Sequence, residues 1–334
     1  MISWIRRLLL AVLFLVATSA AADDAKYFDE MQVRVKHAVE ARDFDGLEAM
    51  AASYRKNSPH TPSGVAYLSM FYRMVFWTIG TLDPPHTPEG SNARHFVDSW
   101  LLQQPRGIAA NIVSVGHLVG RAGDLRGGGY ANTVPADALP KIQSLIALAK
   151  QRLFQARAFA AVDPQWYAEA VDVALLDEQS PGWVEPIFQE GAAHFPVYMP
   201  LYRSMIQYWL PQWYGSYKTI DTMAKRAALA NTPEADGLYA RIYRMLDESC
   251  GCSKPLREKT KIDWTLMKHS MRAVVARYPD SWNFSTFARI SCEAGDIVEA
   301  QFFIARMKHP VDPYFTVSTN GETSCPANSK APQT

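Results

Sequence analysis

The amino-acid sequence predicts an all-α protein in which helical hairpins stack into one continuous solenoid domain. Apolar residues recur at steps of three and four residues through most of the chain, which places them on one face of a helix. Apolar–polar alternation between hairpin turns is almost absent, so no sizeable sheet is expected. Four prolines follow one another at intervals of roughly 30 to 50 residues, the repeat length of helical solenoids. They are Pro164, Pro196, Pro233 and Pro279.

The first half of the chain contains three segments with a clear helical stripe. Segment 65–76 follows the breaker Pro59-His60-Thr61-Pro62, and segment 108–119 repeats its apolar spacing. Segment 139–159 carries the longest stripe, and Pro135 stands just upstream of its start. Because an apolar stripe is buried only against a neighbouring element, each segment is expected to pack against another helix.

The second half alternates Ala-rich helix ends with helices that carry large side chains. Each of the four prolines is expected to end one helix and to open the next, because proline does not fit a helix interior. One hairpin cannot bury both of its faces, whereas stacked neighbours can. The large side chains after the four prolines are Trp166 and Tyr167; Tyr202, Met205 and Trp209; Leu238, Tyr239 and Tyr243; and Trp282, Phe284 and Phe287.

The last hairpin is the most regular one. Pro279 opens a helix that runs through Phe287 to Cys292, the turn Ala294-Gly295-Asp296 follows, and a return helix carries Phe303. Small Ala residues where the helices approach, and the acidic turn, make this unit resemble a tetratricopeptide hairpin. No complete tetratricopeptide signature with Trp, Leu-Gly and Tyr in register occurs. The fold is therefore expected to be a tetratricopeptide-like solenoid.

Residues 44–72, 126–134 and 210–224 resemble segments of an uncharacterised bacterial family of secreted helical proteins, a domain of unknown function. The resemblance covers about residues 25–308, and it implies the helical fold without an activity. Where the family carries a Trp-Gly-Gly-Ser-like run, this chain has Trp213-Tyr214-Gly215-Ser216, so Tyr214 departs from the family pattern.

Residues 1–22 have the three-part layout of a secretory signal peptide. Arg6 and Arg7 form a basic start, residues 8–16 a continuous apolar run, and residues 18–22 a small-residue end. The run has about 10 residues, whereas a helix that spans a membrane needs about 20. Cleavage after Ala22 is therefore favoured over an uncleaved anchor, and the protein is expected to be periplasmic or secreted.

The chain after the signal is expected to divide into an α-helical repeat domain over residues 23–308 and a polar tail over residues 309–334. The tail is expected to be mostly disordered, because it cannot bury enough apolar surface to order itself. The formal net charge of +1 gives no indication of a nucleic-acid partner. No other apolar stretch is long and charge-free enough to predict a membrane span.

The four cysteines are interpreted as structural disulfides, because their number is even and the protein is expected to be exported. A bridge inside Cys250-Gly251-Cys252 would be strained, so Cys250 and Cys252 are expected to pair outward with Cys292 and Cys325, in an order that the sequence does not fix. The alternative is a C-x-C redox or soft-metal site, which lacks neighbouring His ligands here.

No motif for catalysis or for a cofactor stands out, so no catalytic residue, cofactor or metal site is predicted. The His-Glu-x-x-His and Gly-x-Ser-x-Gly motifs are absent. Gly127-Gly128-Gly129 lacks the Lys-Ser/Thr of a phosphate loop and is interpreted as a turn with positive φ. One group of acidic residues is interpreted as a solvated helical face: Asp172, Asp177, Glu178, Glu185 and Glu190.

One aromatic group around Pro211 stands out as a candidate binding surface. Aromatic side chains of this kind form peptide grooves, glycan platforms or interface anchors. They also pack consecutive hairpins together, and packing is the commoner use of large aromatic residues. The five candidate residues are Tyr208, Trp209, Trp213, Tyr214 and Tyr217.

Together these features predict an exported, non-enzymatic helical-repeat protein that binds or scaffolds another macromolecule in the cell envelope. The expected partner is a protein, either an envelope component or a toxin, because solenoids offer an extended concave surface for such contacts. One alternative is an envelope hydrolase that acts on glycan or peptide through carboxylates. The other alternative is a thiol redox protein that uses Cys250 and Cys252.

Overall fold

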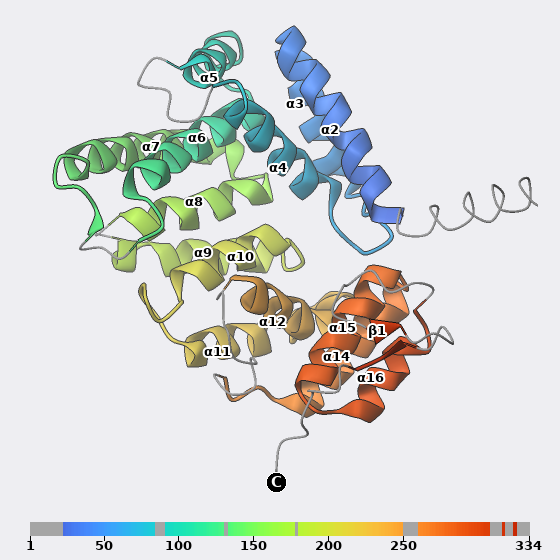
Figure 1. The fold of residues 1–334 in the computed structure, drawn as a ribbon. Coiled ribbons are helices and arrows are strands. Elements are labelled where there is room, and N and C mark those ends of the chain that lie inside the picture. Colours follow the sequence, from blue (N-terminus) through green and yellow to red (C-terminus); the bar gives the residue numbers. More distant parts are fainter. Residues whose placement is uncertain are drawn as a thin grey trace, which may run out of the picture. The chain divides into compact units, whose positions relative to one another are not determined.

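The computed structural model describes residues 23–83, 91–129, 133–177, 180–249, 260–307, 316–317 and 323–325 (Figure 1). Most of these residues lie in helices, which confirms the predicted all-helical fold class. The short strands β1 (Thr316–Val317) and β2 (Thr323–Ser324) pair antiparallel. Regular stacking of tetratricopeptide-like hairpins stays a prediction. None of the helices in the described ranges has both the length and the apolar content that a membrane crossing requires.

The chain forms two compact units. The large unit takes the described residues of 31–59 and 66–262, and the small unit takes those of 1–30, 60–65 and 263–334. The helices of the large unit are, in chain order, the last part of α2 (Asp23–Ala41), then α3 (Phe44–Asn57), α4 (Tyr67–Gly80), α5 (Asn92–Gln103), α6 (Ile108–Arg126), α7 (Leu139–Ala160), α8 (Pro164–Leu176), η2 (Ser180–Gly182), α9 (Val184–His194), α10 (Met199–Tyr208), α11 (Tyr217–Ala227), η3 (Ala235–Gly237) and α12 (Leu238–Ser249).

Side chains that accept hydrogen bonds from free backbone amides set several helix starts in the large unit. Asp43 accepts from the Gly46 amide at the start of α3, and Ser216 accepts from the Thr219 amide at the start of α11. Asp163 caps α8, and Pro164 follows it as the first residue of that helix, where a missing N–H leaves no bond unmade. The helix start predicted at Pro164 is therefore confirmed.

Helix α8 is the most enclosed element of the large unit. Helices α6 and α7 pack side by side along their length (Figure 1), and α8 packs against both of them and against α9 and α10. Its residues from Pro164 to Val171 are all buried, including the aromatic rings of Trp166 and Tyr167. A helix that is enclosed on every side in this way carries its few polar side chains into the core.

The small unit contains α14 (Trp264–Arg277), α15 (Ser281–Glu293) and α16 (Ile297–Ile304). Helices α15 and α16 form the hairpin predicted at this place, with Phe287 and Phe303 in contact at 5.8 Å between ring centroids. Gly295 in the turn has φ of 73°, a conformation that favours glycine. Asp296 then caps α16 by accepting from the Glu299 amide.

The loop of residues 60–65 belongs to the small unit because polar contacts fix it there. The Asp24 carboxylate accepts a hydrogen bond from the Ser63 amide at 3.2 Å and one from the Thr61 hydroxyl at 3.1 Å. The side-chain amide of Asn283 donates to the carbonyls of Ser63 and Tyr278, each at 3.0 Å. The buried Asn283 side chain of α15 thus joins the loop of residues 60–65 to the segment between α14 and α15.

The disulfide of the small unit joins Cys292 to Cys325, with the two Cα atoms 5.7 Å apart. The sequence favoured bonds from both of these residues to Cys250 and Cys252, and that expectation was wrong for this pair. Strand β2 packs beside α16, which folds back on α15, so Cys325 after β2 comes next to Cys292. Cys250 and Cys252 themselves lie outside the described residues, as does most of the predicted tail over 309–334.

We predict that breaking this bridge destabilises the small unit. Cys325→Ser should lower the free energy of unfolding by about 2–4 kcal/mol, because the bridge restricts the unfolded chain. Denaturant unfolding of Cys325→Ser and of Cys292→Ser should give similar losses. Peptide mapping without reduction should recover a peptide pair that contains Cys292 and Cys325. A link from either residue to Cys250 or Cys252 would contradict the pairing.

Candidate functional site

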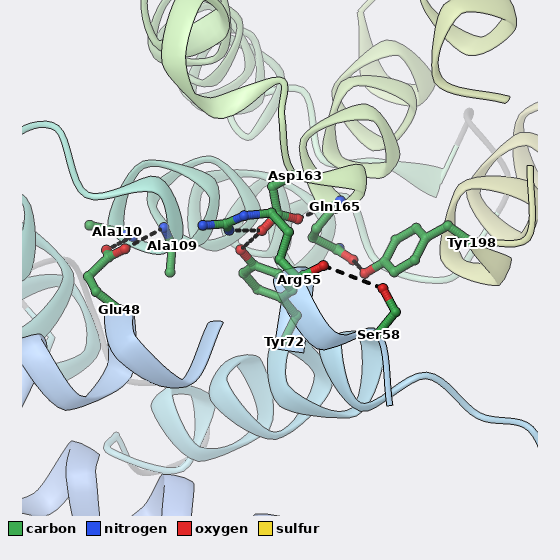
Figure 2. Close-up of polar contacts among 9 residues, drawn as sticks. All are labelled: Glu48, Arg55, Ser58, Tyr72, Ala109, Ala110, Asp163, Gln165 and Tyr198. Atoms are coloured by element: carbon green, nitrogen blue, oxygen red, sulfur yellow. Dashed lines mark hydrogen bonds and ion pairs between the residues drawn. The ribbon is translucent and has the colours of Figure 1, made fainter. Parts of the chain in front are cut away.

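The carboxylate of Asp163 lies fully buried between three helices of the large unit (Figure 2). Its Oδ1 accepts from the Gln165 amide at 2.9 Å and so caps α8. Its Oδ2 accepts from the Arg55 guanidinium of α3 at 2.7 Å and from the Tyr72 hydroxyl of α4 at 2.8 Å. A buried carboxylate needs partners for its charge and its lone pairs, and Asp163 has both.

The electrostatics of this group follow from burial. Burial raises the pKa of Asp163, while the Gln165 amide, the Arg55 charge and the Tyr72 hydroxyl counteract the rise. Burial also raises the pKa of Tyr72 well above its ordinary value, and the neighbouring Asp163 adds to the effect. Tyr72 therefore keeps its proton and donates it in the hydrogen bond to Asp163.

A chain of hydrogen bonds extends the Asp163 group along α8. The Tyr198 hydroxyl donates to the side-chain carbonyl of Gln165 at 2.6 Å (Figure 2). The side-chain amide of Gln165 in turn donates to Oε1 of Glu169 at 2.9 Å. All three side chains are buried, and Glu169 is only 3% exposed. The helix that Asp163 starts thus carries a second buried acid at Glu169, one turn after Gln165.

Glu169 and Asp172 form an acid pair three residues apart on α8. Asp172 is half-buried, and the burial of its carboxyl group raises its pKa to about 6. The pKa of Glu169 is raised well above its ordinary value, first by burial and then by Asp172. Gly116 of α6 leaves room for both the Phe76 ring and the Glu169 carboxyl, since a Cβ at Gly116 would lie 2.5 Å from ring atoms and 2.9 Å from Oε2.

A further carboxylate, that of Glu48, joins α3 to the start of α6 (Figure 2). It accepts from the amides of Ala109 at 3.1 Å and Ala110 at 2.8 Å, which are free donors of the first helical turn. Burial raises the pKa of Glu48, and these amide bonds counteract the rise. Glu48 of α3 therefore caps the start of α6, as an N-terminal aspartate caps the start of its own helix.

The acidic residues that the sequence suggested as a solvated face are mostly in contact with other side chains. Asp172 belongs to the buried pair, so the expectation was wrong for this residue. Asp177 pairs with Lys150 at 2.7 Å and Glu190 with Arg157 at 2.6 Å. Glu185 is exposed, and Glu178 lies outside the described residues. No three potential metal ligands of the His, Cys, Asp or Glu type converge within the described part of the chain.

The structure brings three of the five aromatic candidates together. Tyr208 ends α10, is buried, and lies within hydrogen-bond distance of the Ser180 hydroxyl. Tyr214 stacks on it with 4.6 Å between ring centroids and remains 40% exposed. Trp213 lies beside Tyr214, at 6.5 Å between centroids.

The other two candidates lie apart from this stack. Trp209 turns to α9 and meets the Phe188 ring edge to face at 5.7 Å. Tyr217 is the half-buried first residue of α11. Trp209 thus has the packing role that the sequence favoured for the whole group.

Sequence reasoning missed Arg126, the last residue of α6. Its guanidinium lies 4.5 Å from the centre of the Trp213 ring. It also donates to the carbonyls of Gly127 and Gly129, each at 3.0 Å, and Gly127 has φ of 70° as expected for that turn. The signal in the sequence was the basic residue directly before the glycines. We call Arg126, Trp213 and Tyr214, backed by Tyr208, the aromatic platform.

Comparison with protein-family models, curated proteins and solved structures finds no match. The family resemblance drawn from residues 44–72, 126–134 and 210–224 therefore stays a prediction. Two features of the large unit bear on function: the buried acids of α8 and the aromatic platform near its end.

We predict that Arg55 is needed for the stability of the large unit. Arg55→Ala should lower the free energy of unfolding by about 3–5 kcal/mol, because it leaves the buried Asp163 charge without its cation. Tyr72→Phe should cost about 1.5–3 kcal/mol, the value of a hydrogen bond to a charged group. Denaturant unfolding measures both.

Arg203→Ala is the matched control, because Arg203 pairs with Glu248 at 3.1 Å and its side chain is 55% exposed. An ion pair at the surface is worth at most about 1 kcal/mol. Equal losses for the Arg55 and Arg203 variants would contradict the role given to Asp163.

Proposed function

We propose that the protein is an exported, non-enzymatic helical scaffold that binds a protein partner, an envelope component or a toxin, through the aromatic platform. The observation that carries this proposal is the Tyr214 ring, which is 40% exposed although one face is stacked on buried Tyr208. Together with Trp213 and Arg126 it supplies the Tyr, Trp and Arg side chains that dominate binding energy in protein interfaces.

The platform is held in place before any partner arrives. The Tyr214 amide donates to the Tyr208 carbonyl at 3.0 Å, which fixes the loop after α10. A Cβ at Gly215 would lie 2.8 Å from backbone atoms of Trp209, so the close turn requires glycine there. A side chain that is already ordered loses little conformational entropy on binding. This favours a binding role over an accidental exposure of one ring.

The buried acids support the non-enzymatic part of the proposal. Asp163 is fully buried, Glu169 is 3% exposed, and both are engaged with protein groups. A glycan hydrolase needs two carboxyl groups that face a substrate from opposite sides. The export part rests on the sequence of residues 1–22, with its basic start, short apolar run and small-residue end.

We predict that Tyr214→Ala weakens partner binding by roughly 30-fold, the effect of a hot-spot residue worth about 2 kcal/mol. The mature protein is first used to capture partners from an envelope extract. The dissociation constant of the identified partner is then measured with Tyr214→Ala, Trp213→Ala and Arg126→Ala. All three should bind more weakly while they unfold at nearly the same denaturant concentration as the unchanged protein.

Trp77→Ala provides a matched control, because Trp77 of α4 is an aromatic residue of similar exposure, at 51%. It should leave the dissociation constant unchanged. Partner binding that survives all three platform substitutions, or that falls equally with Trp77→Ala, would contradict the placement of the binding surface.

We predict that the chain is exported and cleaved after Ala22. N-terminal sequencing of protein recovered from the envelope fraction should begin with Asp23-Asp24. Replacing Ala20 and Ala22 by bulky residues should leave the precursor uncleaved, because the small-x-small pattern at the cleavage site would be lost. A recovered chain that begins with Met1 would overturn the export prediction without affecting the assignment of the aromatic platform.

A further inference from the structure

The acid pair on α8 has no role in the proposed binding surface, and no cation compensates it. Neither Glu169 nor Asp172 takes part in an ion pair with a described basic residue. Glu169 receives one hydrogen bond, from Gln165, and the Ser204 hydroxyl of α10 counteracts the rise in the pKa of Asp172. The buried carboxylate of Asp163 behaves differently, since it is paired with Arg55.

The charged groups on the elements packed against α8 are turned to other partners. Of the neighbouring charges, that of Asp172 on the same helix is the one that raises the pKa of Glu169. On α6, His117 interacts with Arg121, Asp98, Asp83 and Arg152. On α7, Lys150 pairs with Asp177, Arg152 with Asp98, and Arg157 with Glu190 of α9. Arg203 of α10 pairs with Glu248, and Tyr198 before α10 donates to Gln165.

We propose that Glu169 and Asp172 form a proton-dependent lock that holds α8 against α6 and α10. In the locked state Glu169 keeps its carboxyl proton and fits, uncharged, into the space that Gly116 leaves. Asp172, which is half-buried, then carries the single negative charge of the pair. Release consists of the transfer of the Glu169 proton to solvent, which leaves two carboxylates less than one turn apart in the core.

The released state is costly because the interior does not screen two like charges. A charged group in the core loses its hydration, and here no basic group replaces it. The repulsion acts between positions three residues apart on one helix, which are neighbours on its surface. The helix can relieve it only by letting water reach the pair, that is, by loosening α8 from α6 and α10.

The direction of the pH dependence follows from the raised pKa values. A carboxyl group whose pKa is higher in the folded than in the unfolded protein stabilises the fold fully below its unfolded pKa. That stability is lost as the pH rises through the folded pKa, which is about 6 for Asp172 and also raised for Glu169. The lock therefore closes in acid and opens toward alkaline pH.

His117 contributes a slope of the opposite sign. Burial lowers its pKa, so the folded protein binds its proton less readily than the unfolded chain does, and stability rises with pH in the range where His117 titrates. Comparing variants with the unchanged protein at each pH cancels this contribution, because His117 is the same in all of them.

The test is hydrogen exchange of α8 and α10 amides in the full mature chain between about pH 5 and about pH 8.5, corrected for the intrinsic exchange rate. In the unchanged protein the opening equilibrium of α8 should rise by up to about tenfold per pH unit while the closed form still holds the Glu169 proton and the open form has released it, and the rise should level off once both forms are ionised. Glu169→Gln resembles the protonated acid in shape and cannot ionise. It should keep α8 protected at alkaline pH, and Asp172→Asn should do so in part.

Glu185→Gln is the matched control, because Glu185 is an exposed acid on neighbouring α9. It should behave as the unchanged protein does. A second readout is the infrared band of a protonated carboxyl group at neutral pH, which should be present in the unchanged protein and in Glu185→Gln and absent in Glu169→Gln. The proposal is overturned if this band is missing, or if Glu169→Gln shows the same pH-dependent opening as the unchanged protein. Should Glu169→Gln fail to fold, the band and the Asp172→Asn exchange data still decide the matter.

Discussion

Asp163 stands between α7 and α8, and its carboxylate performs two tasks with two oxygen atoms. One oxygen caps α8 through the Gln165 amide, and the other takes up the Arg55 guanidinium and the Tyr72 hydroxyl. Because the group is fully buried, it is stable as an anion only while all of these donors are in place. The positions of α3, α4 and α8 are thereby tied to one charge, and α6, α7, α9 and α10 pack around α8.

The same physical constraint explains how polar groups are distributed over the rest of the large unit. Free amides at the start of α6 are satisfied by Glu48 from α3, as those of α8 are by Asp163. The Glu48 contact, and the bonds of Asp163 to Arg55 and Tyr72, cross from one element to another, so they fix the relative position of helices that apolar packing alone would allow to slide. Glu169 and Asp172 are the exception, since their charge is balanced by a proton rather than by a basic side chain.

The sequence predicts what depends on local pattern and misses what depends on distant contacts. The helix after Pro164 and the α15–α16 hairpin could be predicted because proline, capping residues and apolar spacing act over a few residues. The partner of Asp163 could not, because Arg55 lies 108 residues away and surface and core arginines look alike in a sequence. The Cys292–Cys325 bridge could not be predicted either, because it depends on the short strand pair β1–β2. No alternation of apolar and polar residues in the sequence predicts these strands. Of the aromatic candidates, Trp209 and Tyr214 lie within six positions of each other, yet their rings meet different partners, Phe188 and Tyr208.

The binding surface and the proton lock meet at the last turn of α8. The Tyr214 hydroxyl lies 3.5 Å from the Leu175 carbonyl, so the exposed ring of the platform rests on the helix that carries the acid pair. Because this contact belongs to the closed form of α8, a partner that binds the platform in this arrangement favours that form, and so does the proton on Glu169. Two ligands that favour the same form raise each other's affinity by the same factor. A partner would then bind more tightly in acid, and its binding would raise the pKa of the acid pair. In this way the single helix α8 couples a contact at the surface to the buried charge.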